Sequence, residues 1–190
     1  MDIMVTNLQN IKTDADQIII IDNPFPGWVE EYIISQSKII PWGLKYIPEN
    51  DIEEFTFTYG SYVHNHFLED HLHTTKTFNL AFTDLITKEI PAIHPLVLQG
   101  VRWNCLIKGN DANMHIDHHN NDCLTCVYFV NDSDGDLVFY EPNRNEEIKR
   151  CEFKQNRIVL FPSNIKHKAF APVNHKFRIT LAVQFYITGL

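Results

Sequence analysis

The sequence has no apolar run long enough to cross a membrane and no dense cluster of Lys and Arg. A membrane span needs about eighteen consecutive apolar residues, and residues 1–10 lack the charged and then apolar order of a secretory signal. Lys and Arg number 16 against 24 Asp and Glu, so the formal net charge is −8. This balance argues against binding to nucleic acid or to an anionic membrane, which usually requires a basic face. We therefore expect a cytoplasmic protein with no membrane or nucleic-acid partner.

Cysteine is also scarce, with four residues in 190 and no spacing typical of a disulfide framework. Cys123 and Cys126 have the spacing of a zinc-binding or redox pair. In an extended strand, however, residues three apart point to opposite faces. We therefore expect free thiols that are buried or half-buried, as in a protein of a reducing compartment.

The composition predicts one enzyme-sized unit. The chain is 44% hydrophobic, which is enough to bury one substantial core over 190 residues. It has no internal repeat and no low-complexity linker. We expect a single domain over residues 1–190, in which a helix-rich part, residues 1–95, supports a barrel core formed by residues 96–190.

The first half of the chain predicts two short strands and two helices. Apolar or alternating runs predict strands over residues 17–21 and 55–59, the latter as an outer strand. Helices are expected over residues 26–38 and, with a stronger signal, over residues 75–88.

The second of these helices has a clear apolar stripe. Thr74 or Thr75 is available as its N-terminal cap, and Pro91 follows its expected end. The stripe, which recurs at helical spacing, consists of Phe78, Ala81, Phe82, Leu85 and Ile86.

The sequence after Pro95 predicts short strands separated by Gly, Asn, Asp and Pro turns. Such strands suit two facing antiparallel sheets closed into a jelly roll. In the last strand, residues 177–185, odd-numbered residues are apolar and would face a core, while Arg178, Thr180 and the next two even-numbered residues would line a polar cavity. The helices would cover that apolar outer face, so we expect a mostly β (α+β) fold.

A histidine and an aspartate in this half are spaced to bind one metal ion. His115 and Asp117 would point to the same side of an extended segment. With His167 from a distant strand they would supply two imidazoles and one carboxylate, the ligand set of non-haem Fe(II) oxygenases. The His115-Ile116-Asp117 triplet alone is weak evidence for a metal site, because a chain with ten histidines is expected to contain a His-any-Asp triplet by chance.

The surrounding order of motifs makes the pattern specific. Over roughly residues 99 to 187 the chain resembles the 2-oxoglutarate and Fe(II)-dependent oxygenase superfamily, within it the prolyl 4-hydroxylase-like branch. The resemblance is found in the following order of features: His115-Ile116-Asp117, the strand 124–131, the turn Asp134-Gly135-Asp136, the strand 137–140, the run 157–163, His167, and the strand 177–185 with Arg178.

The resemblance implies a fold, cofactors and residue roles. The fold is the double-stranded β-helix, a jelly-roll or cupin-like barrel with iron inside one open end. His115, Asp117 and His167 would bind Fe(II), and Arg178 would hold the distal carboxylate of the co-substrate 2-oxoglutarate, for which a planar guanidinium is well suited. With O2, the reaction hydroxylates an unactivated C–H bond and releases succinate and CO2. A carboxylate at position 117 also argues against a halogenase of this superfamily.

Some positions depart from the family. Phe129 stands where a Tyr commonly donates to the co-substrate, while Tyr128 beside it faces the other way. A hydroxyl from Thr180 or Thr125 could replace that Tyr, or the alignment slips by one residue. The spacing from His167 to Arg178 is slightly longer than is usual in this branch. Lys176 is therefore an alternative to Arg178 as the residue that binds the distal carboxylate of 2-oxoglutarate.

The substrate stays open at this point. The first candidate substrate is a prolyl or other protein side chain. The second is a free amino acid or small metabolite, and the third is a modified nucleobase. Polar loops over residues 108–114 and 142–150, near the expected mouth, would make the choice. A catalytically silent barrel that acts as a binding module is the rival from a different class.

The remaining histidines are weak candidates for a second metal site or for substrate contacts. His64 and His66 with Glu69 faintly resemble the ligand run of cupins, but we expect a solvated loop there. His118 and His119 follow the ligand pair, where they would line the rim of the active site.

Overall fold

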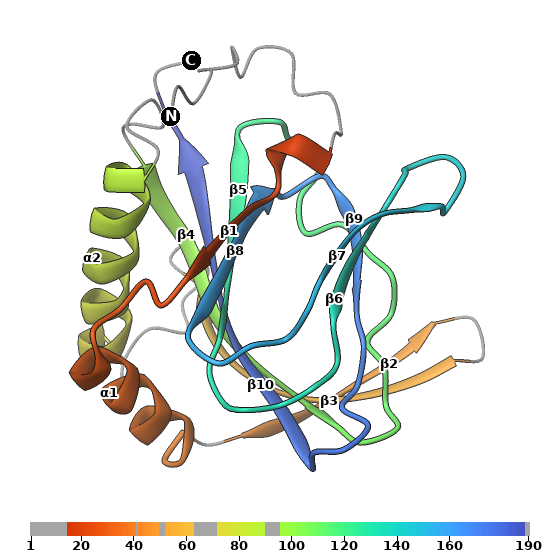
Figure 1. The fold of residues 1–190 in the computed structure, drawn as a ribbon, viewed down its shortest axis with the longest axis horizontal. Coiled ribbons are helices and arrows are strands. Elements are labelled where there is room, and N and C mark those ends of the chain that lie inside the picture. The colour runs from red at the N-terminus through yellow and green to blue at the C-terminus, as the bar shows by residue number, and fades with distance from the viewer. Residues whose placement is uncertain (1–14, 41, 50–51, 63–71, 90–95, 189–190) are drawn as a thin grey trace.

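Two antiparallel sheets face each other and form a barrel (Figure 1). The computed structural model describes residues 15–40, 42–49, 52–62, 72–89 and 96–188. A seven-stranded sheet has the order β1-β8-β5-β10-β4-β3-β2, and a three-stranded sheet has the order β7-β6-β9. The strands are β1 (Ile19–Asp22), β2 (Gly43–Glu49), β3 (Ile52–Tyr62), β4 (Leu96–Ile107), β5 (Cys123–Phe129), β6 (Leu137–Tyr140), β7 (Glu147–Cys151), β8 (Arg157–Pro162), β9 (Lys166–Ala169) and β10 (Phe177–Ile187).

The expected strands of the second half are confirmed. Strands β5, β6, β8 and β10 lie where the alternating runs predicted them, and the antiparallel pairing follows throughout. The strand expected over residues 55–59 lies within β3, which pairs with both β2 and β4 and is therefore one strand in from the edge. The polar loop expected over residues 142–150 is partly wrong, because residues from Glu147 onward pair with β6 as strand β7.

Two helices cover the outer face of the seven-stranded sheet, as expected. Helices α1 (Gly27–Ser37) and α2 (Leu72–Glu89) lie on the same side of the molecule (Figure 1). Ile33 of α1 and Phe82 of α2 are completely buried. They pack against outward side chains of the sheet, and the cluster includes Ile86, Tyr128, Leu181, Val183 and Phe185.

The N-terminal end of α2 differs from the prediction. The helix begins at Leu72, so Thr74 and Thr75 lie within its first turn and do not cap it. Spacing of apolar residues defines the buried stripe of a helix but not its first residue, which explains the error. Pro91 lies outside the described residues.

A second core fills the space between the two sheets. Val127 and Phe129 of β5 point into it, while Cys126 and Tyr128 of the same strand point to the helices. The inner cluster also contains Leu137, Phe139, Phe153, Val159 and Phe161. Strand alternation therefore divides a central strand such as β5 between two cores.

Two other expectations can be compared with the structure. All four cysteines are buried and free, as the sequence predicted. Within the ranges that the structure covers, no helix is both long and apolar enough to cross a membrane.

Candidate metal and co-substrate site

A backbone bridge brings the two histidines together. His115 donates its amide N–H to the carbonyl of His167 at 3.0 Å, and His167 donates its own to the carbonyl of His115 at 2.9 Å. This isolated bridge joins the segment after β4 to strand β9. As a result, residues 52 positions apart in the sequence have their imidazole centroids 4.4 Å apart.

Asp117 is held by contacts with β5 and with the end of β8. His115 forms only an isolated bridge and Asp117 lies in a bend, so neither ligand belongs to a strand, contrary to the extended segment expected from the sequence. The amide of Asp117 donates to the carbonyl of Ser163 at 2.9 Å. The Thr125 hydroxyl donates to Asp117 Oδ2 at 2.7 Å and lies 2.8 Å from the Ser163 hydroxyl.

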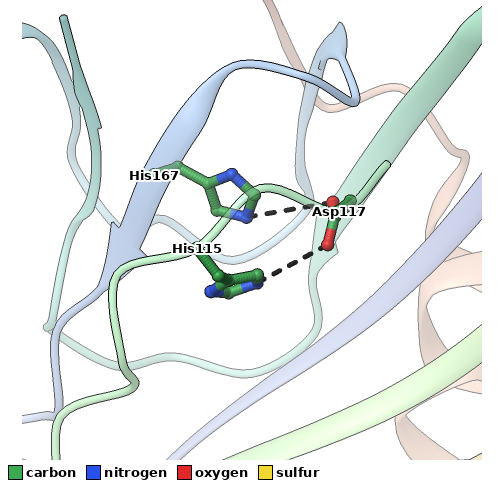
Figure 2. A group of neighbouring side chains, drawn as sticks. All are labelled: His115, Asp117 and His167. Carbon is green, nitrogen blue, oxygen red and sulfur yellow. Dashed lines mark ion pairs between the residues drawn. The ribbon is translucent and has the colours of Figure 1, made fainter. Parts of the chain in front are cut away.

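The three side chains converge on one point. Figure 2 shows both imidazoles facing the Asp117 carboxylate from the same side. His115 Nε2 is 3.5 Å from Asp117 Oδ1, and His167 Nε2 is 3.8 Å from Asp117 Oδ2. One ligand atom from each residue lies within 4.8 Å of the others. The side chain of His115 is 48% exposed whereas that of His167 is 6% exposed, so the group opens to solvent on one side.

Hydrogen bonds to the backbone select the metal-binding nitrogen of each imidazole. His115 Nδ1 lies 2.8 Å from the carbonyl of Asn113, and His167 Nδ1 lies 2.9 Å from the carbonyl of Ile165. Because a carbonyl only accepts, each Nδ1 carries a proton, which leaves each Nε2 as the nitrogen that could bind a metal ion.

Charge at the site suits a divalent cation. Burial lowers the pKa of His167, although Asp117 opposes this shift, so this imidazole is neutral near pH 7. Burial by itself would raise the pKa of Asp117, but His115, His167 and the Thr125 hydroxyl together hold it well below its usual range. Neutral imidazole nitrogens and an ionised carboxylate on one side of a point are the donor set that fits Fe(II).

Arg178 is buried deeper in the same barrel. It is 2% exposed, and its guanidinium carbon lies 4.8 Å from the Phe153 ring centroid and 5.4 Å from that of Phe129. Its Nε donates to the carbonyl of Gly135 at 2.7 Å, whereas Nη2 is buried with no hydrogen-bond partner among the described residues. Burial lowers the pKa of Arg178 to about 9, with Asp136 opposing the shift. A buried donor without a partner is costly, so this position suits a bound anion.

The turn that receives Arg178 requires a glycine. Gly135 has a φ of +107°, and a Cβ at this position would lie 2.5 Å from the carbonyl oxygen of Phe170. The carboxylate of Asp134 beside it accepts hydrogen bonds from the amides of Val173 and Asn174, which ties this turn to the loop before β10.

The family departures are clarified by the side-chain directions. Tyr128 points to the helices and donates its hydroxyl to Asn156 Oδ1 at 3.1 Å, while Phe129 points into the barrel, so the side chain that faces the barrel at this point has no hydroxyl. Of the two hydroxyls considered as replacements, that of Thr125 donates to Asp117, and Thr180 is buried two residues from Arg178. Lys176 is exposed and precedes β10, which argues against it as the anchor.

Among the described residues, no other histidine belongs to the ligand group. His118 receives the amide N–H of Asn120 at Nδ1, and its Nε2 is 3.4 Å from the Tyr186 hydroxyl. His119 is exposed. Residues 63–71, with the histidine-rich segment expected to be a loop, lie outside the described residues.

Arg102 is a charged residue near the site that the sequence interpretation missed. The Asp117 carboxylate acts on it electrostatically. Alternation of the apolar Val101, Trp103 and Cys105 with Arg102 and Asn104 in the strand before the ligand pair is the signal that could have found it.

Comparison with known families agrees with the site. Residues 101–186 match the family model described as the 2OG-Fe(II) oxygenase superfamily, whose members use Fe(II), 2-oxoglutarate and O2. No curated protein matches the chain in sequence. The resemblance found in the motifs is therefore confirmed by the family match.

Solved structures share the fold over most of the chain. An oxidoreductase of the 2OG-Fe(II) oxygenase family from Burkholderia pseudomallei is 12% identical, with 92% of this chain and 87% of that chain covered and a TM-score of 0.73. A prolyl hydroxylase from Trichoplax adhaerens, in complex with a peptide fragment of hypoxia inducible factor, is 17% identical, with coverages of 91% and 84% and a TM-score of 0.62. HygX from Streptomyces hygroscopicus, with nickel, 2-oxoglutarate and hygromycin B bound, is 11% identical, with coverages of 90% and 83% and a TM-score of 0.62. At these identities the likeness establishes the fold, which is the expected double-stranded β-helix.

Proposed function

We propose that this chain, which residues 101–186 place in the 2OG-Fe(II) oxygenase superfamily, hydroxylates an unactivated C–H bond with 2-oxoglutarate and O2 as co-substrates. One oxygen atom of O2 enters the hydroxyl group and the other enters succinate, which forms as 2-oxoglutarate loses CO2. The observation that supports the proposal is the convergence of His115, Asp117 and His167 within 4.8 Å in a barrel of this family.

The three converging residues would hold Fe(II). Bound there, the metal would supply the oxidising chemistry that no amino-acid side chain provides. The contributions of the chain are positional: two backbone carbonyls fix the imidazole tautomers, and the Thr125 hydroxyl fixes the carboxylate of Asp117. The exposed side of His115 leaves the ligand group open toward an incoming substrate.

Arg178 would hold the distal carboxylate of 2-oxoglutarate. Its unpartnered Nη2 can donate to that carboxylate, and the flanking rings of Phe129 and Phe153 keep water away from the guanidinium. A charge-assisted hydrogen bond in such a site is stronger than its counterpart in water.

Two substrate classes follow from the fold. The Trichoplax adhaerens relative was solved with a peptide and HygX with hygromycin B, so proteins that share this fold include one bound to a protein segment and one bound to a small molecule. A prolyl or other protein side chain is the first candidate for this chain, and a free amino acid or small metabolite is the second. The four free cysteines agree with action in the reducing cytoplasm.

Succinate formation tests the proposed reaction. We expect protein loaded with Fe(II) under anaerobic conditions to produce succinate after addition of 2-oxoglutarate and O2, slowly without the primary substrate because turnover is then uncoupled. Asp117→Ala should abolish this production, since it removes a metal ligand. Glu31→Ala, a change at an exposed position of α1, is the matched control and should behave as wild type. Equal background succinate from wild type and Asp117→Ala would favour the silent binding module.

A further inference from the structure

The turn between β5 and β6 is bound to the start of β10, where Arg178 lies. Strand β5 pairs with β10 as far as Phe129, which lies opposite Thr180. After Val130 the chain bends, and residues 131–135, the 131–135 turn, form hydrogen bonds with the first residues of β10 and with the segment before it. The turn therefore contacts β10 on both sides of the arginine and at its side chain.

The Asn131 side chain takes the place of a neighbouring strand beside Arg178. Its Oδ1 accepts the amide N–H of Ile179 at 2.8 Å, and its Nδ2 donates to the carbonyl of Phe177 at 3.1 Å. The Ser133 hydroxyl also donates to the Phe177 carbonyl, at 2.9 Å. Because side chains satisfy these backbone groups of β10, the backbone of the turn itself is free to reach the arginine side chain.

One carbonyl of the turn fixes the guanidinium. Arg178 Nε donates to the carbonyl of Gly135 at 2.7 Å. The guanidinium is planar, so its orientation is limited by this bond and by the rings of Phe129 and Phe153 beside it. In this orientation Nη2 is buried and has no hydrogen-bond partner among the described residues. A shift of the Gly135 carbonyl would therefore turn the guanidinium and change the direction of Nη2.

Asp134 fastens the turn to the segment before β10. Its Oδ1 accepts the amide N–H of Val173 at 3.1 Å, and both the amide N–H and Nδ1 of His175 at 3.3 and 3.1 Å. Its Oδ2 accepts the amide N–H and Nδ2 of Asn174 at 2.8 and 2.7 Å. Burial by itself would raise the pKa of Asp134, but the hydrogen bonds from Asn174 and His175 hold it well below its usual range. The carboxylate is therefore ionised near pH 7 and binds five donors.

We propose that Asn131 and Asp134 are positioning residues for the co-substrate, because they hold the Gly135 carbonyl on Arg178 so that Nη2 meets the distal carboxylate of 2-oxoglutarate in a fixed orientation. This inference rests on the proposed oxygenase function and on the role that it gives to Arg178. A donor that is already held in place loses less conformational freedom when its ligand binds, so the affinity is higher.

The metal ligands are held by other segments. Their hydrogen bonds described above come from Asn113, Thr125 and Ile165, which lie outside the 131–135 turn. Loosening the turn should therefore weaken the binding of 2-oxoglutarate without weakening the binding of Fe(II).

Binding measurements without turnover test the proposal. Anaerobic titration calorimetry gives the affinity for Fe(II) and then the affinity of the Fe(II) protein for 2-oxoglutarate. Asp134→Asn should weaken 2-oxoglutarate binding about 3- to 10-fold, the size of one net hydrogen bond, and leave the Fe(II) affinity within about twofold. Asp132→Asn is the matched control, since it makes the same change in the same turn at a carboxylate that is 86% exposed, and it should match wild type.

Two further variants separate loosening of the turn from loss of the fold. Asn131→Ala removes both hydrogen bonds beside Arg178 and should weaken 2-oxoglutarate binding by about tenfold. Asn174→Ala removes one donor to Asp134 from an exposed residue, so the fold should be kept while the affinity falls by about threefold. Circular dichroism and urea unfolding establish that each variant is folded under the conditions of the titration.

An analogue assigns the effect to the distal carboxylate. 2-Oxopentanoate has the carbon chain and the 2-oxo acid group of 2-oxoglutarate but no distal carboxylate, so it should bind wild type, Asp134→Asn and Arg178→Gln equally weakly. Arg178→Gln should weaken 2-oxoglutarate binding by about 10- to 100-fold, the loss typical of a hydrogen-bonded charged partner. Adding Asp134→Asn to Arg178→Gln should cause no further loss, because both residues act through the same contact.

Several outcomes would overturn the assignment. These are an affinity for 2-oxoglutarate in folded Asp134→Asn or Asn131→Ala equal to that of Asp132→Asn, a parallel loss of Fe(II) or 2-oxopentanoate affinity, or a full additional loss when Asp134→Asn is combined with Arg178→Gln. Absence of 2-oxoglutarate binding to wild type loaded with Fe(II), or unchanged binding in Arg178→Gln, would instead contradict the proposed function.

Discussion

At the residue scale, the Thr125 hydroxyl is the group that fixes the ligand carboxylate. It donates to Asp117 Oδ2 at 2.7 Å from a strand that is buried throughout. We expect Thr125→Val to lower the affinity for Fe(II) by about 10- to 100-fold, the usual effect of losing an outer partner of a metal ligand. Anaerobic titration calorimetry with Fe(II) measures this, and Thr125→Ser, which keeps the hydroxyl, is the control. Unchanged affinity in Thr125→Val would show that the backbone alone positions the carboxylate.

At the scale of the element, the edge strand β1 is fastened to β8 by an ion pair at its end. Asp22 accepts hydrogen bonds from Arg157 Nε at 2.6 Å and Nη2 at 3.0 Å, and it pairs with Lys154 at 3.1 Å. Arg157 is the main cause that lowers the pKa of Asp22 from 3.8 to about 2, against the opposing effect of burial, and Lys154 assists. The edge of the larger sheet therefore depends on an ionised carboxylate.

The pH dependence of this contact follows from the direction of the shift. Because the folded pKa lies below the unfolded value of 3.8, the stabilisation is present above about pH 4 and is lost as the pH falls toward 2. Asp22→Asn should therefore be less stable than wild type at pH 7, by less than about 1 kcal/mol for so exposed a pair, and equally stable near pH 2. Urea unfolding at several pH values measures this, with Glu31→Gln on α1 as the control. A difference that stays constant down to pH 2 would contradict the ion-pair explanation.

At the scale of the whole molecule, the helices and the barrel share a core. Phe82 of α2 is completely buried, with its ring centroid 5.2 Å from that of Phe25 and 6.1 Å from that of Tyr128 on β5. The predicted single domain requires that helices and barrel unfold together.

A matched pair of substitutions on α2 tests this coupling. Phe82→Ala should lower the free energy of unfolding by about 3–5 kcal/mol, and far-ultraviolet circular dichroism and tryptophan fluorescence should report one coincident transition. Leu80→Ala, at a residue 72% exposed on the same helix, should change it by less than about 0.5 kcal/mol. Two separate transitions would show that the helices form a unit of their own.

The local periodicity of the sequence was enough to predict which side chains of several strands and helices share a face. Alternation in residues 177–185 separated the outer core face from the face that carries Arg178, and the helical spacing identified the stripe that contains Phe82. The spacing of His115 and Asp117 placed both side chains on one side even though neither residue lies in a strand. These features repeat every few residues, so neighbouring positions in the chain are sufficient to predict them.

Tertiary structure decided which distant segments meet. The bridge between His115 and His167 aligns the second imidazole with the ligand pair, and the register of β4 on β10 pairs Arg102, on which the Asp117 carboxylate acts electrostatically, with Ala182. The start of α2 and the pairing of β7 with β6 likewise differed from the local prediction. Sheet register depends on side chains far apart in sequence, and a helix can extend beyond its apolar stripe, so neither follows from the period of a single segment.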